Sequence, residues 1–158
     1  MRNIKFRAYI KDTNKRVPSE INKIVEVKSL HLGSRKAIIG YSKSSSNYGN
    51  YSISFDDIEL MQYTGLHDKN GKEIYEGDII EFSYDMFVGN FDTFVAKGVV
   101  VFDEGAFYVE LFENERTTKD EAYLLYSINL DTIEVIGNKF DNPDLLEKGA
   151  EEWMLIRC

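Results

Sequence analysis

The sequence predicts a mainly β protein with one short helix near its C-terminal end, folded as a small barrel with SH3-like elements or as packed antiparallel sheets. Two observations predict this fold class. The 158 residues include only 2 prolines but 10 phenylalanines and 10 tyrosines, and aromatic residues favour strands. Short runs of alternating apolar and polar residues also recur between turn signals rich in glycine, asparagine and aspartate.

The first half of the chain contains several such runs. Residues 5–10 alternate apolar and basic side chains, which is typical of a half-buried strand. Residues 21–32 begin with β-branched residues and predict a strand there, with a helix as the alternative further on. Residues 37–41 and 51–59 predict two more strands. The serine-rich stretch between them, residues 42–50, is expected to be a mobile loop.

In the second half, residues 95–102 and 106–112 predict a hairpin across a short turn that contains Gly105. Residues 124–130 and 132–137 are expected to complete the sheet. The helix is predicted at residues 142–148. Asn142 is its expected capping residue, and Pro143 occupies the first helical position.

The run of residues 60–80 contains the densest turn signals in the chain. Asn70-Gly71 is a strong tight-turn pair, since both residues tolerate positive φ, and Gly65 and Gly77 mark further places where the backbone needs glycine. Asp78 precedes an apolar strand and is expected to bind backbone amides and fix the turn. These five residues, Gly65, Asn70, Gly71, Gly77 and Asp78, are therefore predicted to form a structural turn motif.

The same run does not fit the chemical templates that it superficially matches. Lys72 follows Gly71 without the earlier glycine and the later Ser or Thr of a phosphate-binding loop, and it stands where a calcium loop needs an oxygen ligand. His31, His67 and Cys158 are too few for a zinc site or a nucleophilic triad. We expect no catalytic residue, metal or cofactor. A carboxylate pair or magnesium site remains the alternative, among Asp56, Asp57, Glu59, Glu73, Glu76, Asp78 and Glu81.

Charge is distributed unevenly along the chain. Residues 1–50 hold eleven Lys and Arg against three Asp and Glu, whereas the other 108 residues hold eight basic and 24 acidic side chains. Three interpretations follow: the basic part lies on the acidic body or on a neighbour, it contacts nucleic-acid phosphates, or the charges only aid solubility. The candidate nucleic-acid contacts are Arg2, Lys5, Arg7, Lys11, Lys15 and Arg16.

Residues 1–148 are predicted to form a single domain, with a basic part at 1–50 and an acidic body at 51–148. Residues 149–158 form an apolar tail, in which Trp153, Leu155 and Ile156 are expected to dock onto the body or onto another chain. No apolar run is long enough to span a bilayer, the N-terminus lacks the features of a signal peptide, and there is one cysteine. These features predict a cytoplasmic protein.

Residues 62–80, QYTGLHDKNGKEIYEGDII, resemble the YopX family of phage and prophage proteins. Residues 4–8, 105–107, 133–138 and 142–146 support the resemblance, which therefore covers the chain up to about residue 148. Residues 10–51 and the tail carry no family motif. The resemblance implies a compact, β-rich, phage-encoded protein in a bacterial cytoplasm. It implies no activity, cofactor or catalytic residue.

The expected function is that of a non-enzymatic phage accessory protein acting through protein contacts, by self-association or against a host or phage protein. The alternative is a nucleic-acid-binding protein that uses the basic N-terminal third. A weaker variant is an acidic body that imitates DNA toward a host protein.

Overall fold

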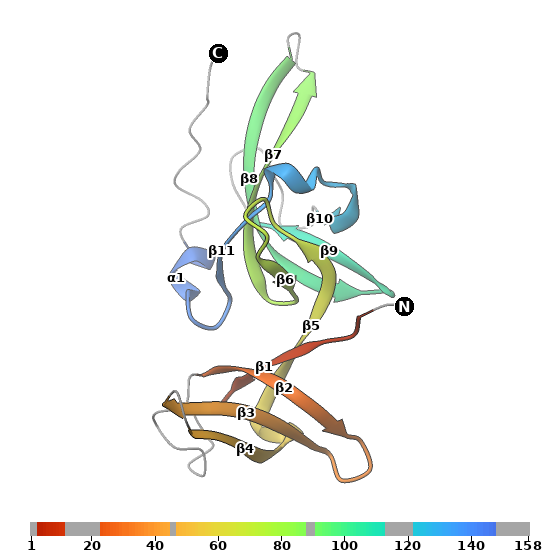
Figure 1. Cartoon of the computed structure of the whole chain (residues 1–158). Helices are drawn as coiled ribbons and strands as arrows, with labels where there is room; N and C mark the ends of the chain where they lie inside the picture. Colours follow the sequence, from red (N-terminus) through yellow and green to blue (C-terminus); the bar gives the residue numbers. More distant parts are fainter. Residues whose placement is uncertain (1–2, 12–22, 45–46, 88–90, 113–121, 148–158) are drawn as a thin grey trace. The chain divides into compact units, whose positions relative to one another are not determined.

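A computed structural model describes residues 3–11, 23–44, 47–87, 91–112 and 122–147 of the chain (Figure 1). The described residues form antiparallel sheets and a single short α-helix, which confirms the predicted mainly β class. By their internal contacts they fall into two compact units, residues 1–63 and residues 64–158. The prediction of one domain over residues 1–148 stays a prediction.

The first unit contributes strands to a six-stranded sheet in the order β4-β3-β2-β1-β5-β6, of which β6 (Glu73–Tyr75) comes from the second unit's part of the chain. A 3₁₀ turn, η1, separates the fourth strand from the fifth, and β5 runs on into the second unit. The elements are β1 (Phe6–Ile10), β2 (Ile24–His31), β3 (Lys36–Ser44), β4 (Asn47–Ser54), η1 (Phe55–Asp57) and β5 (Ile58–His67).

The core of the first unit comes from one face of this sheet. On β1, Ala8 and Ile10 are buried, whereas the alternate residues Lys5, Arg7 and Tyr9 are half-buried. This is the period of two that the sequence shows at residues 5–10. Buried residues from β2, β3, β4 and β5 complete the cluster: Val25, Ala37, Ile39, Ile53 and Ile58.

The second unit contains a five-stranded sheet in the order β10-β9-β8-β7-β11, with a short strand, β6, before it. Its elements are β6 (Glu73–Tyr75), β7 (Asp78–Phe87), β8 (Phe91–Asp103), β9 (Ala106–Leu111), β10 (Ala122–Leu124), the 3₁₀ turns η2 (Leu125–Ser127) and η3 (Leu130–Thr132), β11 (Glu134–Asn138) and the helix α1 (Pro143–Glu147). Its core includes Ile80, Phe82, Val100, Val109 and Leu125.

The two units share one topology. In each, four strands form an antiparallel meander, a 3₁₀ segment follows the fourth strand, and the fifth strand pairs with the first. Among the described residues neither sheet closes, so of the two predicted architectures the packed antiparallel sheets are confirmed and the closed barrel is wrong.

Three local predictions differ from the structure. The loop predicted at residues 42–50 is wrong for its described residues, because β3 extends to Ser44 and pairs with β4 from Asn47 onward, with a shift of register between Ser42 and Ser44. The strand predicted at residues 51–59 is interrupted by η1, where the Ser54 hydroxyl accepts a hydrogen bond from the Asp56 N–H and caps the turn. Residues 125–127 and 130–132 form 3₁₀ turns rather than strands.

The predicted hairpin and helix are confirmed. The hairpin of β8 and β9 turns on Glu104 and Gly105, both at positive φ. The helix begins at Pro143 as expected. The Asn142 Oδ1 atom, however, accepts from the Asn138 N–H, so this side chain ties the helix entry back to β11.

Candidate functional site

Asp68 is the centre of the glycine-rich run. Its carboxylate is buried, and both oxygens accept hydrogen bonds from backbone amides. Oδ1 accepts from the N–H groups of Asn70 (2.8 Å) and Lys72 (2.9 Å), and Oδ2 accepts from the N–H of Val135 (3.0 Å). The last bond spans 67 residues of sequence, so this carboxylate joins the turn after β5 to β11.

The turn around Asp68 is formed by Lys69 and Asn70 and closes with a hydrogen bond from the Gly71 N–H to the Asp68 carbonyl, at 2.9 Å. The sequence suggested positive φ for both Asn70 and Gly71, but only Gly71, at φ +81°, adopts it. The turn is therefore centred one residue earlier than an Asn-Gly hairpin turn. The glycine serves as the left-handed residue that follows it.

Two opposing effects set the pKa of Asp68. Burial raises the pKa of this carboxyl, whereas the three backbone N–H donors and the nearby Lys72 ammonium lower it. The donors prevail, and the pKa lies below its usual value. Asp68 is therefore an ionised structural anchor at neutral pH, and the donors occupy both of its oxygens.

Neighbouring contacts strengthen the same junction. The Lys69 N–H donates to the Ile133 carbonyl at 2.9 Å, and the Lys72 Nζ donates to the Val135 carbonyl at 3.3 Å. The Lys69 Nζ also pairs with Glu134 at 2.6 Å, and this hydrogen bond raises the pKa of Lys69. The side chains of Lys69 and Lys72 thus hold β11 against the turn.

Asp78 forms a second buried junction. Its Oδ2 accepts from the Tyr75 N–H at 2.8 Å, which fixes the bend between β6 and β7, as expected of an aspartate that binds a backbone amide. Gly77, at φ +79°, donates its N–H to the Val100 carbonyl at 2.7 Å. Gly65 also lies at positive φ, +91°, within β5. Of the five predicted turn residues, Asn70, Gly71 and Gly77 thus lie in turns, Asp78 begins β7, and Gly65 lies inside a strand.

Three of the basic residues proposed for nucleic acid are described: Arg7 lies in β1, and Lys5 and Lys11 flank that strand. Lys5 holds its Nζ 5.3 Å from the centre of the Tyr63 ring, and Arg7 is half-buried. Lys11 pairs with Glu59 at 2.9 Å and donates to the Asp56 carbonyl at 3.3 Å. Arg2, Lys15 and Arg16 lie outside the described residues.

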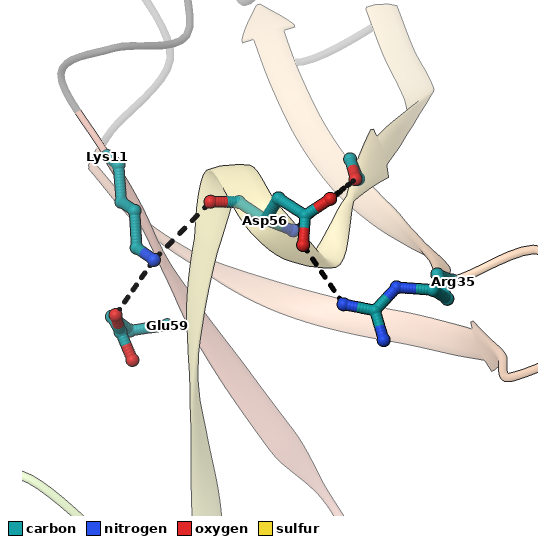
Figure 2. Close-up of polar contacts among 5 residues, drawn as sticks. Lys11, Arg35, Asp56 and Glu59 are labelled. Atoms are coloured by element: carbon teal, nitrogen blue, oxygen red, sulfur yellow. Dashed lines mark hydrogen bonds and ion pairs between the residues drawn. The ribbon is translucent and has the colours of Figure 1, made fainter.

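Figure 2 shows the polar contacts around η1 in the first unit. The Arg35 guanidinium pairs with the Asp56 carboxylate at 3.0 Å, while the Arg35 carbonyl accepts from the Phe55 N–H at 3.0 Å. The hydrogen bond and charge of Arg35 lower the pKa of Asp56, helped by Ser54 and Lys11 and opposed by desolvation. These contacts connect the β2–β3 turn and the end of β1 to one 3₁₀ turn.

Several basic side chains of the first unit form ion pairs with nearby carboxylates. Lys11, Lys28 and Arg35 each pair with a carboxylate of the first unit itself. Two of these pairs, Lys11–Glu59 and Arg35–Asp56, join residues 1–50 to residues 51–148, whereas the Lys28–Glu26 pair lies within residues 1–50. That the basic part as a whole lies on the acidic body stays a prediction. Exposed pairs of this kind add little to stability, because water screens them and ordering two long side chains costs entropy.

Exposed apolar side chains form a feature that the sequence analysis did not identify. Phe102, near the end of β8, is 44% exposed and contacts Phe107 with ring centres 5.0 Å apart. The two phenylalanines are spaced symmetrically about the Glu104-Gly105 turn, and this spacing in the sequence could have predicted that their rings face each other across the hairpin. Other exposed apolar residues are Ile4, Leu32, Tyr126, Leu130 and Leu146. Trp153, Leu155 and Ile156 lie outside the described residues.

The described ranges contain no group of three or more His, Cys, Asp or Glu residues placed to hold a metal ion. No helix within them is long and apolar enough to cross a membrane.

The fold and these junctions define a class: small proteins of two antiparallel β units connected through one strand, with buried aspartates in a glycine-rich run at the start of the second unit. Within this class, the chain belongs to the YopX family, because the sequence model of the YopX protein matches residues 5–147. The match confirms the family predicted from residues 62–80. It also extends across residues 10–51, in which the sequence analysis identified no family motif.

The fold is similar to the crystal structure of protein EF1440 from Enterococcus faecalis. The two chains are 24% identical, the similarity covers 91% of this chain and 98% of the other, and the TM-score is 0.51. At this identity the similarity establishes the fold alone. No curated protein matches this sequence.

Proposed function

We propose that this protein is a non-enzymatic accessory protein of a phage or prophage, acting in the bacterial cytoplasm through contacts with another protein. Membership of the YopX family supports a phage or prophage origin, which the resemblance of residues 62–80 to that family implied. The absence of enzymatic activity and the protein partner are inferences from the distribution of polar and apolar groups described above.

The observation that carries the proposal is the use of Asp68. In a catalytic or ligand-binding loop, polar groups face the ligand with some of their hydrogen-bonding capacity free. Here both oxygens of this buried carboxylate accept from amides of the protein, and Asp78 likewise accepts from the Tyr75 N–H. The buried aspartates of the glycine-rich run therefore serve the fold, and we infer that surfaces elsewhere carry the function.

Exposed apolar residues supply such surfaces. Six large apolar side chains among the described residues are at least one-third exposed, and Phe102 and Tyr126 are aromatic. Aromatic residues are enriched among the anchors of protein interfaces because they bury a large area at a low cost in side-chain entropy. This supports protein contacts as the working mode.

The test is affinity capture from host extract with the full-length protein as bait, followed by light scattering of the complex and of the protein alone. A partner of fixed stoichiometry, or a concentration-dependent dimer, is the expected result. If the protein is a monomer that captures nothing at physiological salt, the proposal is wrong. Comparing full-length protein with residues 1–148 shows whether the apolar tail, with Trp153, Leu155 and Ile156, forms the contact.

Nucleic acid is the alternative partner, which the basic N-terminal third suggests. Lys5 and Lys11 have partners in their own unit, so phosphate contacts would have to replace those interactions. Titration of labelled single- and double-stranded DNA at low salt measures this directly. Binding that falls steeply with salt and is lost on charge reversal of Lys5 and Lys11 would favour nucleic acid over a protein partner.

A further inference from the structure

We propose that the tip of the β8–β9 hairpin, residues 102–107, binds a cationic segment of a partner protein that carries arginine or lysine. This inference rests on the proposed function, because it names the surface and the chemistry of the partner for a protein that acts through protein contacts. Three properties of the tip carry it: a fixed geometry, an exposed aromatic ring supported by a second ring, and negative charge that forms no ion pair with the described residues.

The geometry is fixed by a two-residue turn. Asp103 pairs with Ala106, and the loop residues Glu104 (φ +45°) and Gly105 (φ +86°) both lie in the left-handed region. Positive φ at both positions is typical of the tight turn whose twist matches that of paired strands. A hairpin closed in this way loses little conformational freedom on binding, which favours affinity.

The rings of Phe102 and Phe107 lie directly across this hairpin from one another. Their centres are 5.0 Å apart with an interplanar angle of 58°, a tilted contact rather than a parallel stack. Phe107 packs against the core of the second unit, whereas Phe102 is 44% exposed.

Phe102 therefore lies on the same face of β8 as the core residues, but at a position where the described core leaves much of its side chain uncovered. Two positions earlier on the same face, Val100 is fully buried. A large aromatic side chain on a rigid support, uncovered at the end of a core face, has the properties of an interface anchor.

Charge selects the kind of partner. Asp103 and Glu104 are exposed and form no ion pair within the part of the chain that the structure describes. Residues 64–158 hold 21 Asp and Glu against eight Lys and Arg, so the surrounding charge attracts cations and repels phosphate. The described lysines of this unit are engaged elsewhere: Lys69 with Glu134, Lys72 with the Val135 carbonyl, Lys97 with Glu81, and Lys139 with the Phe140 ring.

Aromatic faces also attract cations. A guanidinium group stacks on a ring while its N–H groups reach carboxylates beside it, so the aromatic and acidic parts of the tip suit the same ligand. A second copy of this chain is a weaker candidate. In its own basic unit, the side chains of Lys5, Lys11, Lys28 and Arg35 are occupied by partners.

The experiment uses the full-length, isotope-labelled protein and two synthetic peptides with blocked ends. One alternates glycine and arginine; the other carries citrulline, the neutral isostere, in place of arginine. Amide shifts in nuclear magnetic resonance spectra locate the contact. We expect the arginine peptide to shift residues 101–108 first, the citrulline peptide to bind more weakly, and the difference to shrink as salt is raised.

Two variants and one control test the assignment. Phe102→Ala is expected to weaken arginine-peptide binding about two- to fivefold, the range for an exposed cation–π contact. Asp103→Asn with Glu104→Gln is expected to remove the preference for arginine over citrulline. Asp131→Asn with Asp144→Asn removes the same charge from exposed positions elsewhere in the second unit and is expected to leave binding at the tip unchanged.

Several outcomes would overturn the inference. They are shifts spread over the acidic surface with equal losses in test and control variants, no binding, or equal binding of both peptides. A concentration-dependent dimer that masks residues 101–108 would assign the tip to self-association instead. If Phe102→Ala and wild type capture the same host protein equally, the tip inference fails while the proposed function stands. Failure to capture any partner counts against the proposed function, whatever the peptides show.

Discussion

Replacing Asp68 by asparagine tests the interpretation that this carboxylate is a structural anchor. The side chain keeps its size, but the substitution removes the charge and replaces one acceptor oxygen by an NH₂ donor. Asp68 accepts from three backbone N–H groups, of which that of Val135 is in a buried hydrogen bond. In either orientation of the amide, a backbone donor faces another donor.

The magnitude follows from these three bonds. Leaving a buried N–H without an acceptor costs about 1–3 kcal/mol, and exchanging a charged acceptor for a neutral one costs roughly 1 kcal/mol more per bond retained. Water can partly replace the lost acceptor at Asn70 and Lys72, which lie on an exposed turn. We therefore expect Asp68→Asn to lower the free energy of unfolding of the second unit by about 2–4 kcal/mol.

The assay is urea unfolding followed by circular dichroism, together with hydrogen exchange of the Val135 amide. If the Val135 amide exchanges only when the whole second unit unfolds, a loss of about 2–4 kcal/mol makes its exchange roughly 30- to 1000-fold faster. Asp103→Asn is the matched control, because it makes the same chemical change at an exposed carboxylate. Equal unfolding midpoints for Asp68→Asn and wild type would refute the reasoning.

The pH dependence supplies a second check on the same residue. The folded pKa of Asp68 lies below its usual value, so its ionised form stabilises the fold above the unfolded pKa, which is about 3.9. The stabilisation is lost as the pH falls through the lowered folded pKa. The stability difference between wild type and Asp68→Asn should accordingly be full near pH 7 and shrink below about pH 4. A difference that stays constant into strong acid would exclude the ionised carboxylate as its source.

Three further substitutions probe packing, backbone and surface charge. Gly98→Ala should destabilise the second unit by about 1–3 kcal/mol in thermal unfolding, because its Cβ would overlap the Glu110 carbonyl oxygen; an unchanged midpoint would mean that β8 and β9 can separate there. Phe82→Ala should cost about 3–5 kcal/mol in urea unfolding, since this ring is 1% exposed in the core, and a loss below about 1 kcal/mol would contradict that burial. Arg35→Ala should leave the thermal midpoint within experimental error despite its pairing with Asp56, because both partners are exposed; a clear drop would show that the η1 contacts act as a unit.

Prediction from sequence succeeded where local patterns coincide with local structure. The alternation of apolar and basic residues at 5–10 correctly predicts a half-buried strand, because successive side chains on a strand point to opposite faces. Gly105 between two apolar runs correctly predicts a hairpin, and Pro143 correctly predicts the start of a helix. Each signal resides in a few adjacent residues.

Prediction failed where strand pairing outweighed local preference. The serine-rich residues 42–50 resemble a loop, yet the described ones pair between β3 and β4, with a shift of register after Ser42, because backbone hydrogen bonds to a neighbouring strand need no particular side chain. The interruption at η1 depends on Ser54 binding the Asp56 amide, which alternation alone does not reveal.

The sequence by itself determined that this is a β-rich protein of the YopX family, because the turn residues and apolar periodicity of residues 62–80 are local and specific. Only the tertiary structure decided that Asp68 holds Val135, 67 residues away, and that the two units repeat one strand order. It also left the rings of Phe102 and Phe107 together at an exposed hairpin tip. Such contacts join residues that are distant along the chain, so their partners are chosen by the register of strands and not by the residues beside them.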